Sequence, residues 1–142
     1  MGVVVPEIDV NFVAVFIATI VSMVIGSLWF SPLLFGKLWI ALSGKSQKEL
    51  AGQKKRGMIH IWILAFVGAF ITSYVLYHFT VLLSMETLAD ALLGAFWIWL
   101  GFIAPVQLGI VLWDGKPWKL FVLLAAYHLI NLMVIAGVLV LW

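Results

Sequence analysis

Long apolar runs alternate with short polar segments along this chain. The apolar runs cover about 10–35, 58–83, 87–113 and 118–142. Each exceeds the roughly 20 residues that an α-helix needs to cross the hydrocarbon layer of a bilayer. The runs are continuously apolar rather than alternating, which favours helices over the strands of a membrane barrel. The pattern predicts an all-α membrane protein whose single domain, 1–142, contains four transmembrane helices.

Composition supports a membrane location. Of the 142 residues, 65% are hydrophobic and 10% are charged, whereas soluble domains are about 45–50% apolar and about 25% charged. A chain this short cannot bury so much apolar surface in a core of its own. The absence of cysteine excludes disulfides and thiolate metal sites, and a net charge of +2 gives no reason to expect a nucleic-acid partner.

The positive charges predict the orientation of the helices. Six of the eight Lys and Arg residues lie in the segment 36–57, and the other two are Lys116 and Lys119. The N-terminal segment, the turn at 83–87 and the C-terminus carry none. Because short loops rich in Lys and Arg stay in the cytoplasm, we expect both basic segments to be cytoplasmic. Both termini are then expected on the non-cytoplasmic side.

The basic loop 36–57 contains a helix-start signal. Ser46 and Glu49 have the spacing of a capping box, which predicts a short interfacial helix from about Ser46 to Arg56. Lys54, Lys55 and Arg56 would then contact anionic lipid headgroups. The alternative is that these charges serve as a topology signal alone.

Small residues recur at every fourth position in two of the apolar runs. Such stripes allow close approach of helix backbones in lipid. They predict helix packing, either within one chain or between copies. In the first run the stripe is Ala14, Ala18, Ser22 and Gly26, and in the second it is Ala65, Ala69 and Ser73.

A few polar side chains interrupt the apolar runs, where they are costly and commonly face a bundle interior. His128 lies about 16 Å past Pro117 at the helical rise, near the midplane, and Asn131 follows one turn later. Gln107 and Ser31 are expected nearer the cytoplasmic boundary. These four residues are the candidate polar site for a solute or partner. Three alternatives stay open for His128. It can be a neutral histidine bonded to a neighbouring helix, part of a solute or proton pathway, or a ligand for a haem-like or quinone-like group.

Catalytic machinery is not visible in the spans, which hold no carboxylate pair, no Ser/His/Asp set and no histidine cluster. We therefore expect no enzyme activity, no metal and no cofactor. One enzymatic hypothesis remains, a lipid-modifying enzyme, and it needs Asp90, His78 and Asn11 to meet at the outer face. Pro32 and Pro105 are expected to interrupt the first and third helices.

One segment carries a family resemblance. The run Gly26–Lys37, GSLWFSPLLFGK, followed by Trp39 resembles the uncharacterised domain-of-unknown-function family 1761, and so do Trp99–Phe102 and the pair Tyr127-His128. The resemblance covers nearly the whole chain. It implies a small four-helix membrane protein without an established activity. Because most members are bacterial, we expect the inner cell membrane as the location. This chain departs from the family at Pro105-Val106-Gln107, where the family tends to have threonines and an asparagine.

Two functions are compatible with these features. The first is a non-enzymatic multi-pass membrane protein that forms a homo-oligomer and binds or transports a small solute or ion. The alternative is an accessory or scaffold subunit of a larger membrane complex, in contact with lipid or a hydrophobic cofactor. In both, the partners are membrane lipids and other membrane-embedded chains.

Overall fold

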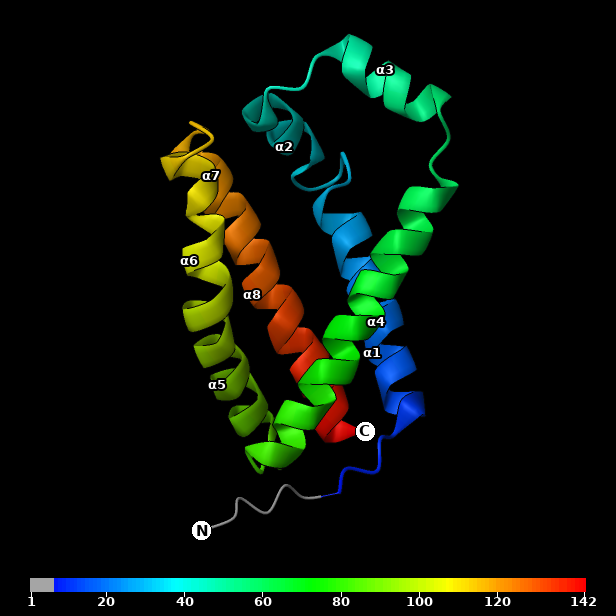
Figure 1. The fold of residues 1–142 in the computed structure, drawn as a ribbon, viewed down its shortest axis with the longest axis vertical. Coiled ribbons are helices and arrows are strands. Elements are labelled where there is room, and N and C mark those ends of the chain that lie inside the picture. The colour runs from blue at the N-terminus through cyan, green and yellow to red at the C-terminus, as the bar shows by residue number, and fades with distance from the viewer. Residues whose placement is uncertain (1–6) are drawn as a thin grey trace.

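The computed structural model describes residues 7–142 and consists of helices and connecting turns within that range (Figure 1). Four stretches there are long and apolar enough to cross a membrane, namely α1 (Phe12–Trp29), α4 (Ile59–Leu82), the interrupted stretch Leu88–Leu112 and α8 (Trp118–Leu141). They confirm the four predicted spans and the all-α fold class. They indicate a multi-pass membrane protein.

The helices form a bundle with two different ends. The first described residues, the turn between α4 and α5 (Leu88–Ile98) and the C-terminus lie at one end (Figure 1). At the other end lie α2 (Gly36–Ser43), α3 (Gln47–Lys55) and α7 (Gly109–Leu112). The two basic segments therefore share one end of the molecule. The side of the membrane that this end faces stays a prediction.

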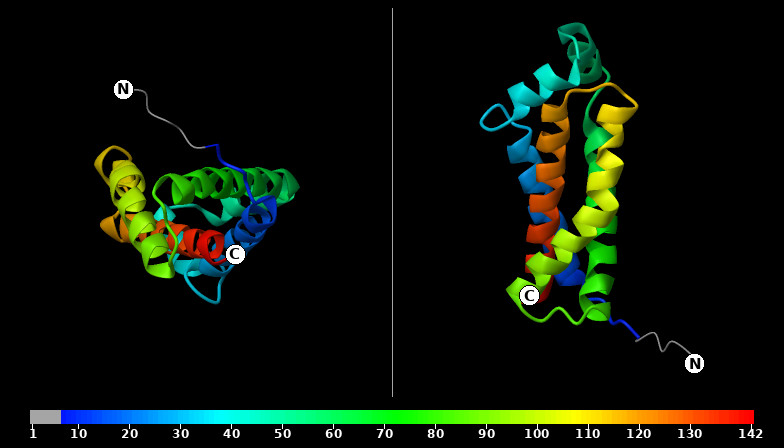
Figure 2. Two further views of the ribbon diagram at one scale, coloured as in Figure 1. Left: turned by 90° about the horizontal axis from the view of Figure 1, so that it is seen from below. Right: turned by 90° about the vertical axis from the view of Figure 1, so that its left-hand side faces the viewer.

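Helix α8 is central, because it packs against α1, α4 and α5 (Figure 2). The contact is close because α1 presents small side chains: Ala14 and Ala18 are fully buried, and Ser22 is buried as well. Ile135 and Ala136 of α8 are also fully buried. Ala14 and Ala18 of the α1 stripe thus pack within the chain.

The first span ends earlier than its apolar run. Helix α1 stops at Trp29, and the run continues to about residue 35 as a tight turn that contains Pro32. The turn is closed by backbone hydrogen bonds from Phe35 N to Trp29 O (3.0 Å) and from Gly36 N to Ser31 O (2.9 Å). A first helix over 10–35 is therefore wrong at its C-terminal end, because Pro32 and this turn divert the chain into α2.

The basic segment holds two helices. The predicted interfacial helix is present as α3, and Ser46 Oγ accepts a hydrogen bond from Glu49 N at its start (3.1 Å). Helix α2 was not predicted, because its residues continue an apolar run without a clear start signal.

The third span is interrupted at the expected place. Pro105 has no N–H to donate, and the chain before it widens into a π-helical turn, η1 (Trp99–Ile103), before α6 (Ala104–Gln107). Ala104 N–H donates to the Trp99 carbonyl, five residues back. The span therefore runs on through the proline as α5, η1, α6 and α7.

Candidate functional site

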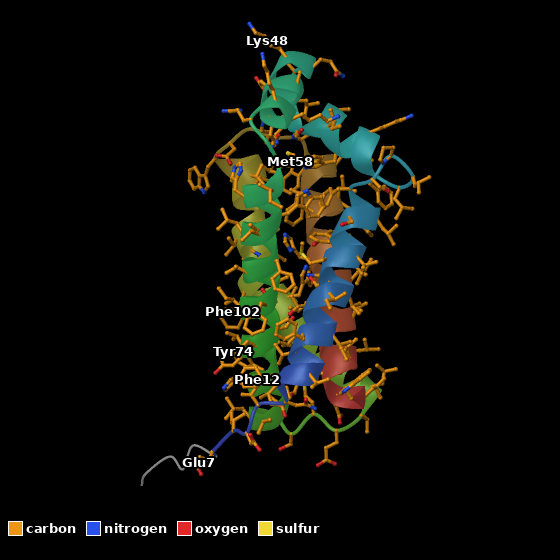
Figure 3. The ribbon with its side chains drawn as sticks, turned by 90° about the vertical axis from the view of Figure 1, so that its right-hand side faces the viewer. Glu7, Phe12, Lys48, Met58, Tyr74 and Phe102 are labelled. Atoms are coloured by element: carbon orange, nitrogen blue, oxygen red, sulfur yellow. The ribbon has the colours of Figure 1, made fainter. Side chains whose placement is uncertain are left out.

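A cavity of about 790 Å³ lies between α1, α4 and α8, in the half of the bundle nearest α3. Trp39 of α2, Gln53 of α3 and Met58, just before α4, line its end nearest α3, and Figure 3 shows Met58 at the α3 end of α4. Most of the lining is apolar. The polar side chains that reach it from the spans are Ser22, Ser27, Thr72, Tyr127, His128 and Asn131.

Helix α8 forms the polar wall of the cavity. Tyr127, His128 and Asn131 share one face of α8, because residues three and four apart in a helix are neighbours. The rings of Tyr127 and His128 lie 5.0 Å apart. Asn131 Oδ1 is buried and has no hydrogen-bond partner in the part of the chain that the structure describes. Leaving such an oxygen unpaired costs about 1–3 kcal/mol, so this amide is an unsatisfied polar group on the cavity wall.

Small side chains of α4 form the facing wall. Ala65, Gly68, Ala69 and Thr72 line the cavity. A Cβ built on Gly68 would meet nothing within 4 Å. Of the predicted α4 stripe, Ser73 is buried, Ala69 is half-buried and Ala65 is exposed. Ala65 and Ala69 of this stripe therefore leave space for the cavity and do not pack α4 closely against a neighbouring helix.

Aromatic rings close the cavity towards α2. Phe30 packs edge-on against Tyr127 (5.0 Å between centroids) and against Trp39 (5.3 Å). Beside them, Trp29 lies 4.6 Å from Phe35, and its indole Nε1 is buried without a partner among the described residues. The segment Gly26–Lys37, singled out in the sequence, thus builds this aromatic wall. On α1, a Cβ at Gly26 would lie 3.0 Å from the Tyr127 hydroxyl.

The structure divides the predicted polar set. His128 and Asn131 line the cavity, whereas Ser31 and Gln107 are absent from its lining. Ser31 Oγ donates to the Leu28 carbonyl (2.7 Å), so it serves the turn after α1. Gln107 is half-buried at the end of α6. The four residues therefore do not form one site.

Four polar side chains of the lining, Ser22, Ser27, Thr72 and Tyr127, were not predicted for the polar site. Thr72 has an inconspicuous position among apolar residues, and its Oγ1 donates to the Gly68 carbonyl of its own helix (3.0 Å). Tyr127 was noted beside His128 without a role. The available signal was the adjacency of Gly68 and Thr72 to the small-residue stripe, which packing explained equally well.

The predicted polar cluster at the outer face is not formed. Asn11 Oδ1 accepts from Ala14 N (3.2 Å), Asp90 Oδ2 accepts from Thr87 N (3.0 Å), and His78 Nδ1 lies 2.8 Å from the Tyr74 carbonyl. Each side chain thus serves the backbone near it, as helix caps and back-bonded residues do. These bonds do not join the three residues to one another, so they give the lipid-modifying hypothesis no support.

The charged and metal-ligating side chains are dispersed. Lys54 and Lys55 are exposed at the end of α3, and Arg56 lines a second, smaller cavity beside the α3 end of the first. Within residues 7–142, no group of three or more His, Cys, Asp or Glu side chains is arranged to hold a metal ion. The side chains that line the first cavity offer hydrogen bonding and apolar contact.

Comparison with known families gives one match. The model of the DUF1761 family, described as "Protein of unknown function", matches residues 13–140. Neither the curated proteins nor the solved structures contain a match to this chain. The matched region includes all four spans almost entirely, the aromatic wall and the polar face of α8. The chain belongs to the DUF1761 family.

Proposed function

We propose that this protein is a non-enzymatic multi-pass membrane protein that binds a small, predominantly apolar molecule in the cavity between α1, α4 and α8. The observation that carries the proposal is Asn131. Its amide lies on the cavity wall about 20 Å along α8, near the middle of the span, and its buried oxygen has no partner among the described residues.

The size and lining of the cavity indicate the class of ligand. Its volume of about 790 Å³ falls within the range of about 300–1,000 Å³ that is usual for small-molecule sites. A mostly apolar lining with a few polar groups favours an apolar body with one hydrogen-bonding function. A hydroxyl or an amide fits best, because either can both donate and accept a hydrogen bond and so can pair with the Asn131 amide or with His128.

The cavity ends within the bundle, which supports binding rather than an open pore. Its lining does not extend beyond Leu132 on α8 or Thr72 on α4. Beyond them, Leu76 and Ile135 are buried in the core, and Phe12 stacks against Tyr74 (Figure 3). Transport of the ligand would require a second conformation in which α4 moves away from α1 and α8 at that end.

A second candidate function is that of a subunit in a larger membrane assembly, formed with copies of this chain or with other proteins. It is favoured by the large apolar side chains exposed along and after the third span, among them Phe102 (74% exposed) and Trp113 (86% exposed). Lipid contact accounts for the same exposure. For both functions we propose that the protein lies in the inner membrane of a bacterium. Its basic end is then proposed to face the cytoplasm.

The binding proposal is tested with Asn131→Leu, a replacement of similar volume. Native mass spectrometry of the full chain, extracted in mild uncharged detergent, should reveal a non-covalent adduct in the wild type. Loss of one hydrogen bond should reduce adduct occupancy about fivefold in Asn131→Leu. Gln107→Leu is the matched control, because it removes an amide in a span outside the cavity. A wild type without adduct, or equal occupancy in Asn131→Leu, would contradict the proposal.

A further inference from the structure

A second cavity, of about 510 Å³, lies beside the α3 end of the first and differs from it in chemistry. We name it the head cavity. Gln53 of α3 and Ile61 of α4 line both cavities. The ionisable side chains of the head cavity are Lys45, Glu49, Arg56 and His60. A mostly apolar space inside the bundle thus shares two wall residues with a charged space at its end.

We propose that a single anionic amphiphile occupies both cavities, with a phosphate headgroup in the head cavity and its apolar body between α1, α4 and α8. The inference rests on the proposed function, because the body fills the cavity described there. It adds the charge of the ligand and the place at which that charge is held.

The charge of the head cavity favours an anion. Lys45 and Arg56 supply two positive charges against one negative charge from Glu49. Arg56 Nε donates to the Gly52 carbonyl (3.2 Å), which holds the side chain against the last turn of α3. Lys45 Nζ lies 5.0 Å from the centre of the Trp39 ring, and Trp39 lines the first cavity. Lys45 therefore lies where the charged space meets the apolar one.

The start of α4 adds hydrogen-bond donors to the same place. His60 and Ile61 belong to the first turn of this 24-residue helix and line the head cavity. Its N-cap residue, Met58, makes no side-chain cap, and Trp62 N–H is bonded to the Met58 carbonyl. The N–H groups before Trp62 have no intrahelical acceptor, and the positive end of the helix dipole favours an anion there.

The shared wall favours a lipid over free phosphate as the source of the anion. A free phosphate would use the cationic side chains and the α4 N-terminus, but it would leave the apolar cavity unused. A lipid headgroup at the end of the spans places its chain along Gln53 and Ile61 into that cavity. Polybasic segments attract anionic headgroups at this depth.

The test compares two lysolipids with the same oleoyl chain, lysophosphatidylglycerol and lysophosphatidylcholine. Binding to the full chain is measured by native mass spectrometry in uncharged detergent. We expect the wild type to bind the anionic lysolipid about fivefold more tightly, the effect of one basic side chain near a headgroup. Arg56→Gln and Lys45→Gln should each reduce this preference, and Glu49→Gln should increase it. Lys54→Gln removes the same charge outside both cavities and should leave the preference for the anionic lysolipid unchanged.

The outcomes separate this inference from the proposed function. Equal binding of the two lysolipids, or an equal loss in Lys54→Gln and Arg56→Gln, overturns the inference as general surface attraction. Displacement of lysophosphatidylglycerol by inorganic phosphate at equal concentration also overturns it, because the head cavity then takes free phosphate.

Asn131→Leu should weaken the binding of both lysolipids equally. If it does so while the headgroup preference is absent, the proposed function stands and the inference fails. If the preference is present and Asn131→Leu has no effect, the claim that the body fills the first cavity fails.

Discussion

Gly36 lies where the turn after α1 enters α2, and the fold leaves no room there for a side chain. A Cβ at this position would meet the backbone carbonyl oxygen of Phe30 and would lie 2.7 Å from the Ser31 carbonyl carbon. Backbone atoms cannot rotate away, so the turn itself must shift. We predict that Gly36→Ala lowers the free energy of unfolding by about 2 kcal/mol, measured by thermal or denaturant unfolding in detergent.

Gly68→Ala is the matched control for that measurement. Its Cβ would enter the cavity, where nothing lies within 4 Å, and alanine favours a helix by about 0.5–1 kcal/mol over glycine. This variant should therefore be as stable as the wild type or slightly more stable. Equal destabilisation by both substitutions would contradict the close packing at Gly36.

Single residues of the candidate site were predictable to different degrees. His128 and Asn131 could be found because polar groups in an apolar run are costly and are retained near an internal space. Ser31 could not be separated from them in sequence, because its role depends on the turn that lets its hydroxyl reach the Leu28 carbonyl. Thr72 was missed because a threonine in a membrane helix can satisfy its hydroxyl on its own backbone, as this one does.

At the scale of elements, start signals were reliable and packing partners were not. Ser46 and Glu49 fixed the start of α3 because capping is a local interaction. The stripe Ala65, Ala69 and Ser73 has the same spacing as the α1 stripe, and in both helices the members nearest α3 line the cavity, Ala65 and Ala69 in α4 and Ser22 and Gly26 in α1. Spacing alone cannot distinguish a small residue that allows a neighbouring helix to pack closely from one that lines a cavity. The difference depends on where α4 lies relative to α1 and α8.

The cap of α3 gives a prediction at this scale. Ser46→Ala removes the acceptor for Glu49 N, and loss of such a cap costs about 1 kcal/mol. Local opening of α3 should become about fivefold more frequent, which hydrogen exchange of the Gln47–Lys55 peptide would measure. Ser43→Ala is the control in the same segment, because its hydroxyl donates to the Ile40 carbonyl of α2. Similar acceleration of exchange in both variants would mean that Ser46 does not act as the cap.

At the scale of the whole molecule, the four spans were predictable because a backbone in lipid has few alternatives to a helix. The arrangement of the spans was not, since α8 becomes central through contacts with α1, α4 and α5 that no local pattern encodes. The position of the cavity follows from this arrangement. It lies at the end of the bundle that carries both basic segments, so its orientation in the membrane decides which side supplies the ligand.

Orientation can be tested directly because the chain has no cysteine, so a single introduced thiol reports its own side. Lys48 in α3 and Glu86 in the α4–α5 turn are exposed at opposite ends of the bundle. The positive-inside rule places Lys48 in the cytoplasm. A membrane-impermeant maleimide applied to intact cells should therefore label Glu86→Cys, whereas Lys48→Cys should be labelled after the membrane is permeabilised. Labelling of Lys48→Cys in intact cells, with Glu86→Cys protected, would reverse the orientation and place the end of the bundle that carries both basic segments on the outer side.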